Sequence, residues 1–220
     1  MTAEQTPTEL TSPWPDNGLD RIIASASADP MRGGESYARL HAAQRRFQDA
    51  MSGAALPDDP DLARRIADQL TEFADLLAAH QVSEPERWDG WRTDLPGRGH
   101  PLLPPYVVTG ETETTLTAQV TFGRFFLGGN GAVHGGGQPL LFDDLLGRLV
   151  NHGRPGVSRT AYLKVNYRRI TPIGEPLTVF LSIDRIEGRK RWCTGTLTSE
   201  DGTVVSDVDS LFLALLPGQP

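Results

Sequence analysis

The sequence predicts an α+β fold, in which one long central helix lies among the strands of an antiparallel sheet. Two observations carry this prediction. After residue 105, short runs rich in Thr, Val and Phe alternate with polar residues, as half-buried strands do. Residues 135–151 instead carry leucine or valine on most sides of a helix, which is typical of a buried helix.

The first hundred residues differ in composition and are expected to lie outside this domain. Residues 1–32 are rich in Pro, Thr, Ser and Asp, and predict a flexible or surface-packed segment in which Trp14 is a local anchor. Residues 33–100 predict a helical extension and a connector. Apolar residues recur at helical spacing in two stretches: Tyr37, Leu40, Ala43 and Phe47, then Leu62, Ile66, Leu70, Phe73 and Leu77.

The remaining residues, 101–218, contain the predicted strands in order. The runs YVVTG and TTLTAQVTFGRFFLGG predict a strand pair joined by GETE. A helix from Gly135 or Gly136 to about Asn151 follows. Four further strand candidates are separated by TPIG, EGRK and EDG, each with the glycine that tight hairpins favour. These four predict an antiparallel meander.

Bulk properties narrow the class of protein. The chain has 220 residues, 38% of them hydrophobic, and a net charge of −7, which disfavours nucleic acid and anionic membranes as partners. Cys193 is the only cysteine and the histidines are dispersed, so neither a disulfide nor a metal site is expected. With no signal peptide or membrane span in the sequence, we expect a cytoplasmic protein.

The stretch AVHGGGQPLLFDDLLG combines a glycine turn with two carboxylates in an apolar helix. The first N–H groups of such a helix lack partners within the helix and can bind an oxyanion or a polarised carbonyl. Asp143 lies about two turns further on, where buried neighbours would require a polar partner for its charge. Asp144 points about 100° away, so we expect it to face solvent or a neighbouring subunit, without a catalytic role. A tight helix entry and a purely structural Asp143 would explain the same pattern.

The same stretch resembles the HGGxxxxLxD motif of hotdog-fold thioesterases, specifically the PaaI-like and thioesterase-superfamily-member group. The matching residues are His134, Gly135, Gly136, Leu141 and Asp143. A second block, RTAYLKVNYRRITPIGEPL, is similar to that group's strand with T-x-x-L-x-x-x-Y before a Pro-Gly turn. The resemblance covers about residues 104–216 and implies a hotdog fold, a long helix wrapped by a curved antiparallel sheet.

The resemblance implies roles for individual residues. Asp143 would act as general base or nucleophile against an acyl-CoA thioester, while the Gly135 N–H would hold the thioester carbonyl oxygen. Thr160 would orient the water or the carboxylate, usually from the partner subunit. His134 belongs to the same site, although its ring could simply bond the backbone and fix the turn.

The substrate-binding residues expected beside these are Gly136, Asn130 and Gln138. Some relatives carry an Asn six residues before the motif histidine, where this chain has Gly128. The thioester would then be polarised by fewer donors, or Asn130 would substitute. Basic residues could meet the phosphates of coenzyme A, or could simply form a charged hairpin tip and strand edge: Arg168, Arg169, Arg189, Lys190 and Arg191.

The leading hypothesis is therefore an acyl-CoA thioesterase that needs no cofactor, since coenzyme A is part of the substrate. The resemblance implies a homodimer or a dimer of dimers with shared active sites. Two alternatives stay open: a non-catalytic protein that binds acyl-CoA or a related thioester, and an enoyl-CoA hydratase-like enzyme on the same fold.

Overall fold

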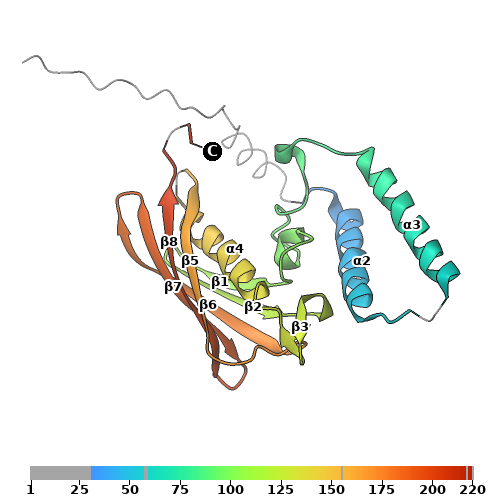
Figure 1. Ribbon diagram of the computed structural model, residues 1–220. Coiled ribbons are helices and arrows are strands. Elements are labelled where there is room, and N and C mark those ends of the chain that lie inside the picture. The colour runs from blue at the N-terminus through green and yellow to red at the C-terminus, as the bar shows by residue number, and fades with distance from the viewer. Residues whose placement is uncertain (1–30, 57–58, 155, 217, 220) are drawn as a thin grey trace, which may run out of the picture.

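The computed structural model describes residues 31–56, 59–154, 156–216, 218 and 219. The segment expected at residues 1–32, including Trp14, therefore lies almost entirely outside the described residues. Figure 1 shows a curved sheet that surrounds one helix, with two further helices to one side of it.

The sheet is antiparallel throughout, and its strands follow the order β1-β2-β6-β7-β8-β5. Strand β5 is therefore an edge strand with β8 as its one neighbour. A separate pair, β3 and β4, precedes the central helix α4. The bounds are β1 Val107–Glu111, β2 Thr115–Thr121, β3 Leu127–Gly129, β4 Ala132–Val133, α4 Gly137–Asn151, β5 Ser158–Tyr167, β6 Pro176–Glu187, β7 Lys190–Ser199 and β8 Val204–Ala214.

Helix α4 supplies the centre of the hydrophobic core. Its fully buried side chains pack against alternate residues of the sheet, as the continuous leucine pattern predicts. The residues of the helix with no exposed surface are Leu141, Phe142, Leu145, Leu146, Leu149 and Val150. A long helix wrapped by an antiparallel sheet confirms the expected hotdog fold.

Two boundaries differ from the sequence prediction. Helix α4 begins at Gly137 rather than at Gly135 or Gly136, because the preceding residues form a turn in which the Gly137 N–H donates to the carbonyl of His134 at 2.8 Å. The second predicted strand is shorter than its apolar run. Strand β2 ends at Thr121, and a 3-10 turn, η3 (Arg124–Phe126), follows and leads into β3.

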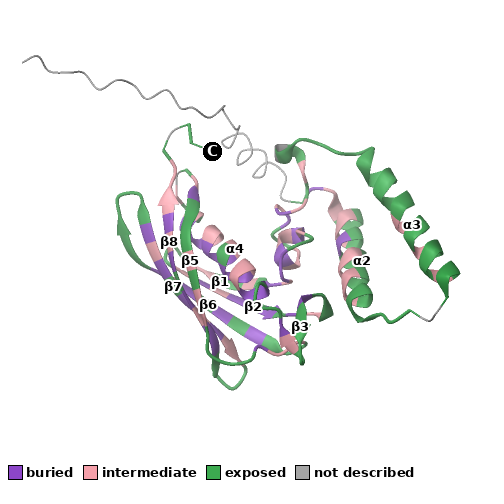
Figure 2. Cartoon of the chain, viewed as in Figure 1, coloured by how far each residue is buried: buried purple, intermediate pink, exposed green. Residues whose placement is uncertain are grey.

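The extension contains helices α2 (Gly34–Gly53) and α3 (Pro60–Ala78), then short 3-10 turns η1 (Glu84–Glu86) and η2 (Pro96–Gly99). Helix α2 lies against the sheet domain: its Asp49 carboxylate accepts a hydrogen bond from the Phe125 N–H at 2.9 Å. In the part of the chain that the structure describes, the apolar stripe of α3 is not buried by a comparable contact. No residue of α3 is buried, and Figure 2 shows this helix almost wholly exposed. Among the described residues, no helix has both the length and the hydrophobicity needed to cross a bilayer.

Candidate active site

The glycine turn before α4 is held by its own histidine. The Nδ1 atom of His134 accepts a hydrogen bond from the Gly136 N–H at 3.0 Å, and the His134 N–H donates to the carbonyl of Phe126 at 2.7 Å. The His134 ring thus bonds the backbone and fixes the turn. This is the structural role that the sequence left open for it.

This turn leaves one backbone donor available. Of the N–H groups of residues 134–137, that of Gly135 alone has no partner among the described residues. Gly135 is exposed, and its carbonyl accepts a hydrogen bond from the Tyr167 hydroxyl at 2.6 Å. The peptide between Gly135 and Gly136 is therefore fixed from both sides. The preceding peptide, which carries the Gly135 N–H, is held through its His134 carbonyl, which accepts from the Gly137 N–H at 2.8 Å. A rigid, exposed donor at the N-terminus of a helix is suited to an oxyanion or a polarised carbonyl.

Asp143 lies further along α4, and its carboxylate is exposed rather than buried, which corrects the sequence expectation. Its apolar neighbours in sequence face the core, whereas Asp143 points away from it toward β5. There the Thr160 hydroxyl donates to Oδ1 of Asp143 at 2.7 Å. The pairing expected from the resemblance is thus present, but within one chain. The second carboxylate oxygen, Oδ2, accepts no hydrogen bond from any described residue.

Asp144 is the more buried of the two aspartates, which is also contrary to expectation. Its side chain is 12% exposed, and it accepts hydrogen bonds from Nε of Arg98 at 3.1 Å, from Nη2 of Arg98 and from the Tyr106 hydroxyl. Burial raises the pKa of Tyr106 well above its usual range, and the neighbouring Asp144 carboxylate raises it further, so this hydroxyl stays a donor. Asp144 thus anchors the connector to α4.

Sequence reasoning missed Arg98 and Tyr106. The one sequence signal for Arg98 was its position between two glycines in the connector. Glycines on both sides indicate a tight turn, which would fix the direction of the Arg98 side chain. Arg98 has φ 58°, between Gly97 at φ 60° and Gly99 at φ 66°. A residue with a side chain rarely occupies this left-handed region, and an arginine held there is a candidate for a function.

The predicted substrate-binding residues differ in burial and in position. Gln138 is 2% exposed and donates to the Thr171 hydroxyl at 2.8 Å, so it does not face a ligand as expected. Asn130, with φ 50°, lies exposed at the turn between β3 and β4. Gly136 caps α4. At Gly128 a Cβ atom would lie 2.7 Å from Cα of His134, so the backbone leaves no room for the side chain that some relatives carry there.

The basic residues proposed for the phosphates of coenzyme A are largely engaged within the chain. Arg191 is 8% exposed and donates to the Ser158 hydroxyl at 2.9 Å, and Arg168 forms an ion pair with Asp207. Arg189 donates to the carbonyl of Ala214 at 3.0 Å. These contacts favour the alternative, a hairpin and strand edge stabilised by charge.

Asp143 and Thr160 line a groove of about 1010 Å³. One side of this groove is formed by α4 and the start of β5. The other side comes from the connector, including Trp91 and Arg98. A groove of this size is large enough for the acyl and pantetheine parts of a thioester.

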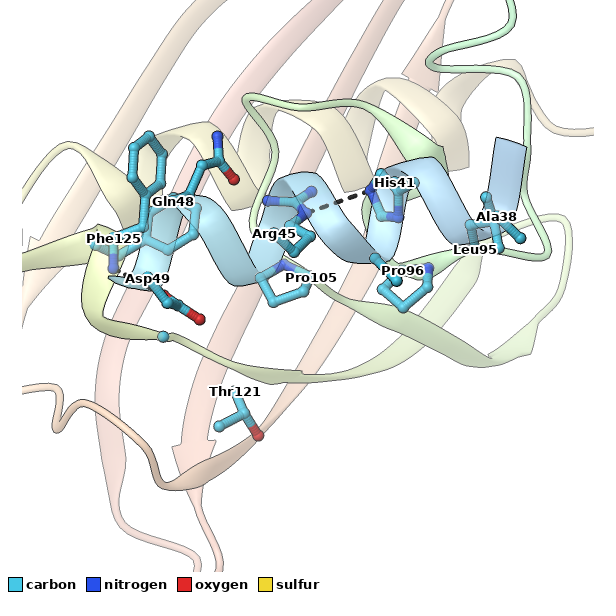
Figure 3. Close-up of a pocket in the computed structure, with 13 residues that line it drawn as sticks. Ala38, His41, Arg45, Gln48, Asp49, Leu95, Pro96, Pro105, Thr121 and Phe125 are labelled. Carbon is cyan, nitrogen blue, oxygen red and sulfur yellow. Dashed lines mark hydrogen bonds between the residues drawn. The ribbon is translucent and has the colours of Figure 1, made fainter. Parts of the chain in front are cut away.

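A second cavity, of about 490 Å³, lies between α2 and the end of β2. Figure 3 shows His41, Arg45, Gln48 and Asp49 on α2 lining this cavity, with Nε of Arg45 donating to Nε2 of His41 at 3.3 Å. Burial lowers the pKa of His41 to about 4, and the nearby guanidinium of Arg45 lowers it further. This cavity contains none of the motif residues, so the groove beside Asp143 is the candidate active site.

No model of a protein family matches the chain. It is 26% identical over 160 residues to the bovine (Bos taurus) acyl-coenzyme A thioesterase THEM4, a match that covers 72% of this chain and 66% of the relative. It is 31% identical over 91 residues to the mouse (Mus musculus) THEM4, covering 41% and 39%. The chain thus spans less than two thirds of the length of either curated relative.

A solved structure matches more completely. A protein whose crystal structure is described as a thioesterase superfamily protein is 31% identical, with a TM-score of 0.68. The superposition covers 80% of this chain and 94% of the other. Because the sheet domain begins near residue 107, a match over 80% of the chain extends into the residues before it.

Proposed function

Because the chain belongs to the thioesterase superfamily, we propose that it hydrolyses the thioester bond of acyl-coenzyme A substrates. One observation carries the proposal. The groove presents a carboxylate, Asp143, that is oriented by the Thr160 hydroxyl and has one oxygen without a partner among the described residues. The thioesterase relatives support the substrate class.

In this proposal Asp143 acts as a general base. Its free oxygen accepts a proton from a water molecule as the water oxygen attacks the thioester carbonyl carbon. Thr160 holds the other carboxylate oxygen and so fixes the orientation of the base. The negative charge that develops on the carbonyl oxygen is stabilised by the Gly135 N–H at the positive end of α4. Collapse of the tetrahedral intermediate breaks the C–S bond, and the departing thiolate takes up the proton that Asp143 accepted from water, which restores the base. The reaction uses no separate cofactor.

The two halves of this machinery are too far apart within one chain. Asp143 is the seventh residue of α4, so at a rise of about 1.5 Å per residue it lies roughly 9 Å along the helix from Gly137, and Gly135 lies in the turn before that residue. They also lie at opposite ends of β5, since Tyr167 contacts Gly135 and Thr160 contacts Asp143. A single carbonyl group cannot lie beside both. A complete site therefore requires a second copy of the chain.

The free edge of β5 provides a route to such a dimer. Among the described strands, β5 pairs only with β8, so its other edge can bind a second copy in antiparallel orientation. A two-fold axis near Leu163 and Lys164 would place Thr160 opposite Tyr167 of the partner subunit. Asp143 of one chain would then face the glycine turn of the other. We propose a homodimer with two shared sites on this basis.

The test of activity is a thiol-release assay with short, long and aromatic acyl-CoA substrates. The Asp143→Asn variant keeps the shape of the side chain but cannot act as a base, so kcat should fall by about 100-fold or more. Asp75→Asn, on the exposed face of α3, is the matched control and should hydrolyse at the parent rate. Full activity of Asp143→Asn would contradict the mechanism. Binding of acyl-CoA without any thiol release by the parent would indicate a non-catalytic thioester-binding protein.

Shared sites can be tested separately by mixing two inactive variants. Asp143→Asn removes the base, and Gly135→Pro removes the N–H donor. After subunit exchange, half of the dimers should contain one of each, and one of the two sites in such a dimer has both native groups. Recovery of about a quarter of the parent activity is expected. No recovery despite proven exchange would contradict a site shared between subunits.

A further inference from the structure

The groove that contains Asp143 has a wall from outside the hotdog domain. Residues of the connector between α3 and β1 line it opposite α4 and β5, among them Gly90, Trp91, Thr93 and Arg98. Trp91 is half-buried, and it is the one tryptophan among the described residues that line the groove. A half-buried aromatic ring in a ligand groove usually provides apolar contact area for the ligand.

This wall is fixed to the catalytic helix. Arg98 donates twice to the Asp144 carboxylate, which directly follows Asp143 in α4. Nη1 of Arg98 also donates to the carbonyl of Gly90 at 2.5 Å, and the Gly90 N–H donates to the carbonyl of Arg98 at 3.0 Å. Since Trp91 is the next residue after Gly90, these hydrogen bonds and the ion pair with α4 hold the backbone that carries Trp91.

The backbone around Arg98 supports a role beyond simple connection. Arg98 is held in the left-handed region between two glycines, and the Gly97 N–H donates to the carbonyl of Tyr106 at 2.9 Å. A glycine at position 98 would adopt this conformation more easily. The strained turn therefore serves to place the arginine side chain, which forms an ion pair with Asp144 in the groove.

We propose that this connector forms the substrate-selecting wall of the active site, with Trp91 limiting the size of the acyl group. The proposal rests on the proposed function, because it takes the groove beside Asp143 and Thr160 as the place where the acyl thioester binds. The connector is locked by Arg98 and Asp144, so the wall is rigid. Acyl groups that fit beneath the indole ring of Trp91 bind, and longer ones meet it.

The test measures binding rather than turnover, so that it does not depend on hydrolysis. Calorimetry would give the dissociation constants of non-hydrolysable S-alkyl coenzyme A thioethers with short, medium and long alkyl chains. In Trp91→Ala the affinity for the long chain relative to the short chain should rise about tenfold, as expected when a hydrophobic site gains room for further methylenes. Thr93→Trp, at an exposed position on the same wall, adds a ring to the groove and should lower that ratio.

Trp88→Ala is the matched control. Trp88 lies three residues earlier, is 47% exposed and packs edge-to-face on Tyr37 with ring centroids 5.6 Å apart. It is not one of the described residues that line the groove. Its removal should loosen the contact with α2 and leave the chain-length ratio unchanged.

Three results would overturn the proposal. One is an unchanged ratio in both Trp91→Ala and Thr93→Trp. Another is a uniform loss of affinity that includes coenzyme A itself, which would assign the wall to the nucleotide part of the substrate. The third is a change in oligomeric state with no change in the ratio, which would assign it to the partner subunit. Failure of the proposed function has a different signature, namely thioether binding by a parent protein that releases no thiol from any acyl-CoA.

Discussion

Replacement of either adjacent aspartate on α4 by alanine should have a different main effect. Asp144→Ala should mainly lower stability, and Asp143→Ala should mainly lower activity. Asp144 accepts two hydrogen bonds from Arg98 and one from Tyr106. The Arg98 side chain is 28% exposed, whereas Tyr106 is buried. Breaking a fully buried ion pair by removing one partner costs about 3–5 kcal/mol. Because water reaches part of this pair, Asp144→Ala should lower the free energy of unfolding by about 2–3 kcal/mol.

Asp143→Ala removes one hydrogen bond at an exposed site and should change the free energy of unfolding by about 0.5 kcal/mol or less. Urea unfolding, monitored by circular dichroism, would measure both variants. At about 2–4 °C per kcal/mol for a chain of this size, the melting temperature of Asp144→Ala should fall by roughly 5–10 °C. Activity should show the reverse order, with Asp143→Ala the less active protein. Equal destabilisation by the two substitutions would refute the assignment of distinct roles.

A double replacement distinguishes the lost ion pair from a general disturbance of α4. Arg98→Met combined with Asp144→Leu leaves no unpaired charge in the cluster and should be more stable than Asp144→Ala alone. The Tyr106 hydroxyl would still lack its acceptor, so recovery should be partial. A double variant less stable than either single variant would contradict the electrostatic explanation.

Other predictions concern the fold and the glycine turn. His41, whose pKa falls to about 4 in the folded chain from an unfolded value of 6.5, takes up a proton on unfolding between these pH values; stability should therefore fall by up to about 3 kcal/mol as the pH drops through this range, and urea unfolding of His41→Gln should show a smaller loss. Gly195→Ala would place a Cβ 2.3 Å from Cδ2 of Leu181 and should lower stability by about 1–3 kcal/mol in thermal unfolding. Tyr167→Phe frees the Gly135 carbonyl and should lower kcat by about 3- to 10-fold with little change in melting temperature; unchanged kcat would show that the hydroxyl does not position the turn.

The sequence predicted an α+β fold and the order of its elements because these depend on local patterns, and the resemblance to the thioesterase motifs implied that this arrangement is a hotdog fold. Leucine on most sides of residues 137–151 requires burial, and alternating residues with glycine turns require an antiparallel sheet. The glycine turn could also be predicted, because its motif residues, His134 to Gly136, are consecutive in the sequence. The pairing of Thr160 with Asp143 followed from the resemblance, although within one chain rather than across subunits.

The environments of the two aspartates could not be predicted in the same way. Helical geometry states that Asp143 and Asp144 face different directions, but which of them is covered depends on what packs against α4. That partner is Arg98, 46 residues earlier in a connector without periodicity. Its position follows from three consecutive residues in the left-handed region, and only two of these are glycines. Contacts across such sequence distances are properties of the assembled fold.

The absence of a side chain at position 128 has a consequence for protein engineering. The resemblance implies that some family members carry Asn at this position, so a designer who follows a consensus of the family would place Asn there. In this chain, the backbone of His134 occupies the space that such a residue would need. The change would push apart the strand and the turn that presents the Gly135 N–H, and under the proposed mechanism it should lower kcat. A consensus is a safe guide only where the surrounding backbone is also shared.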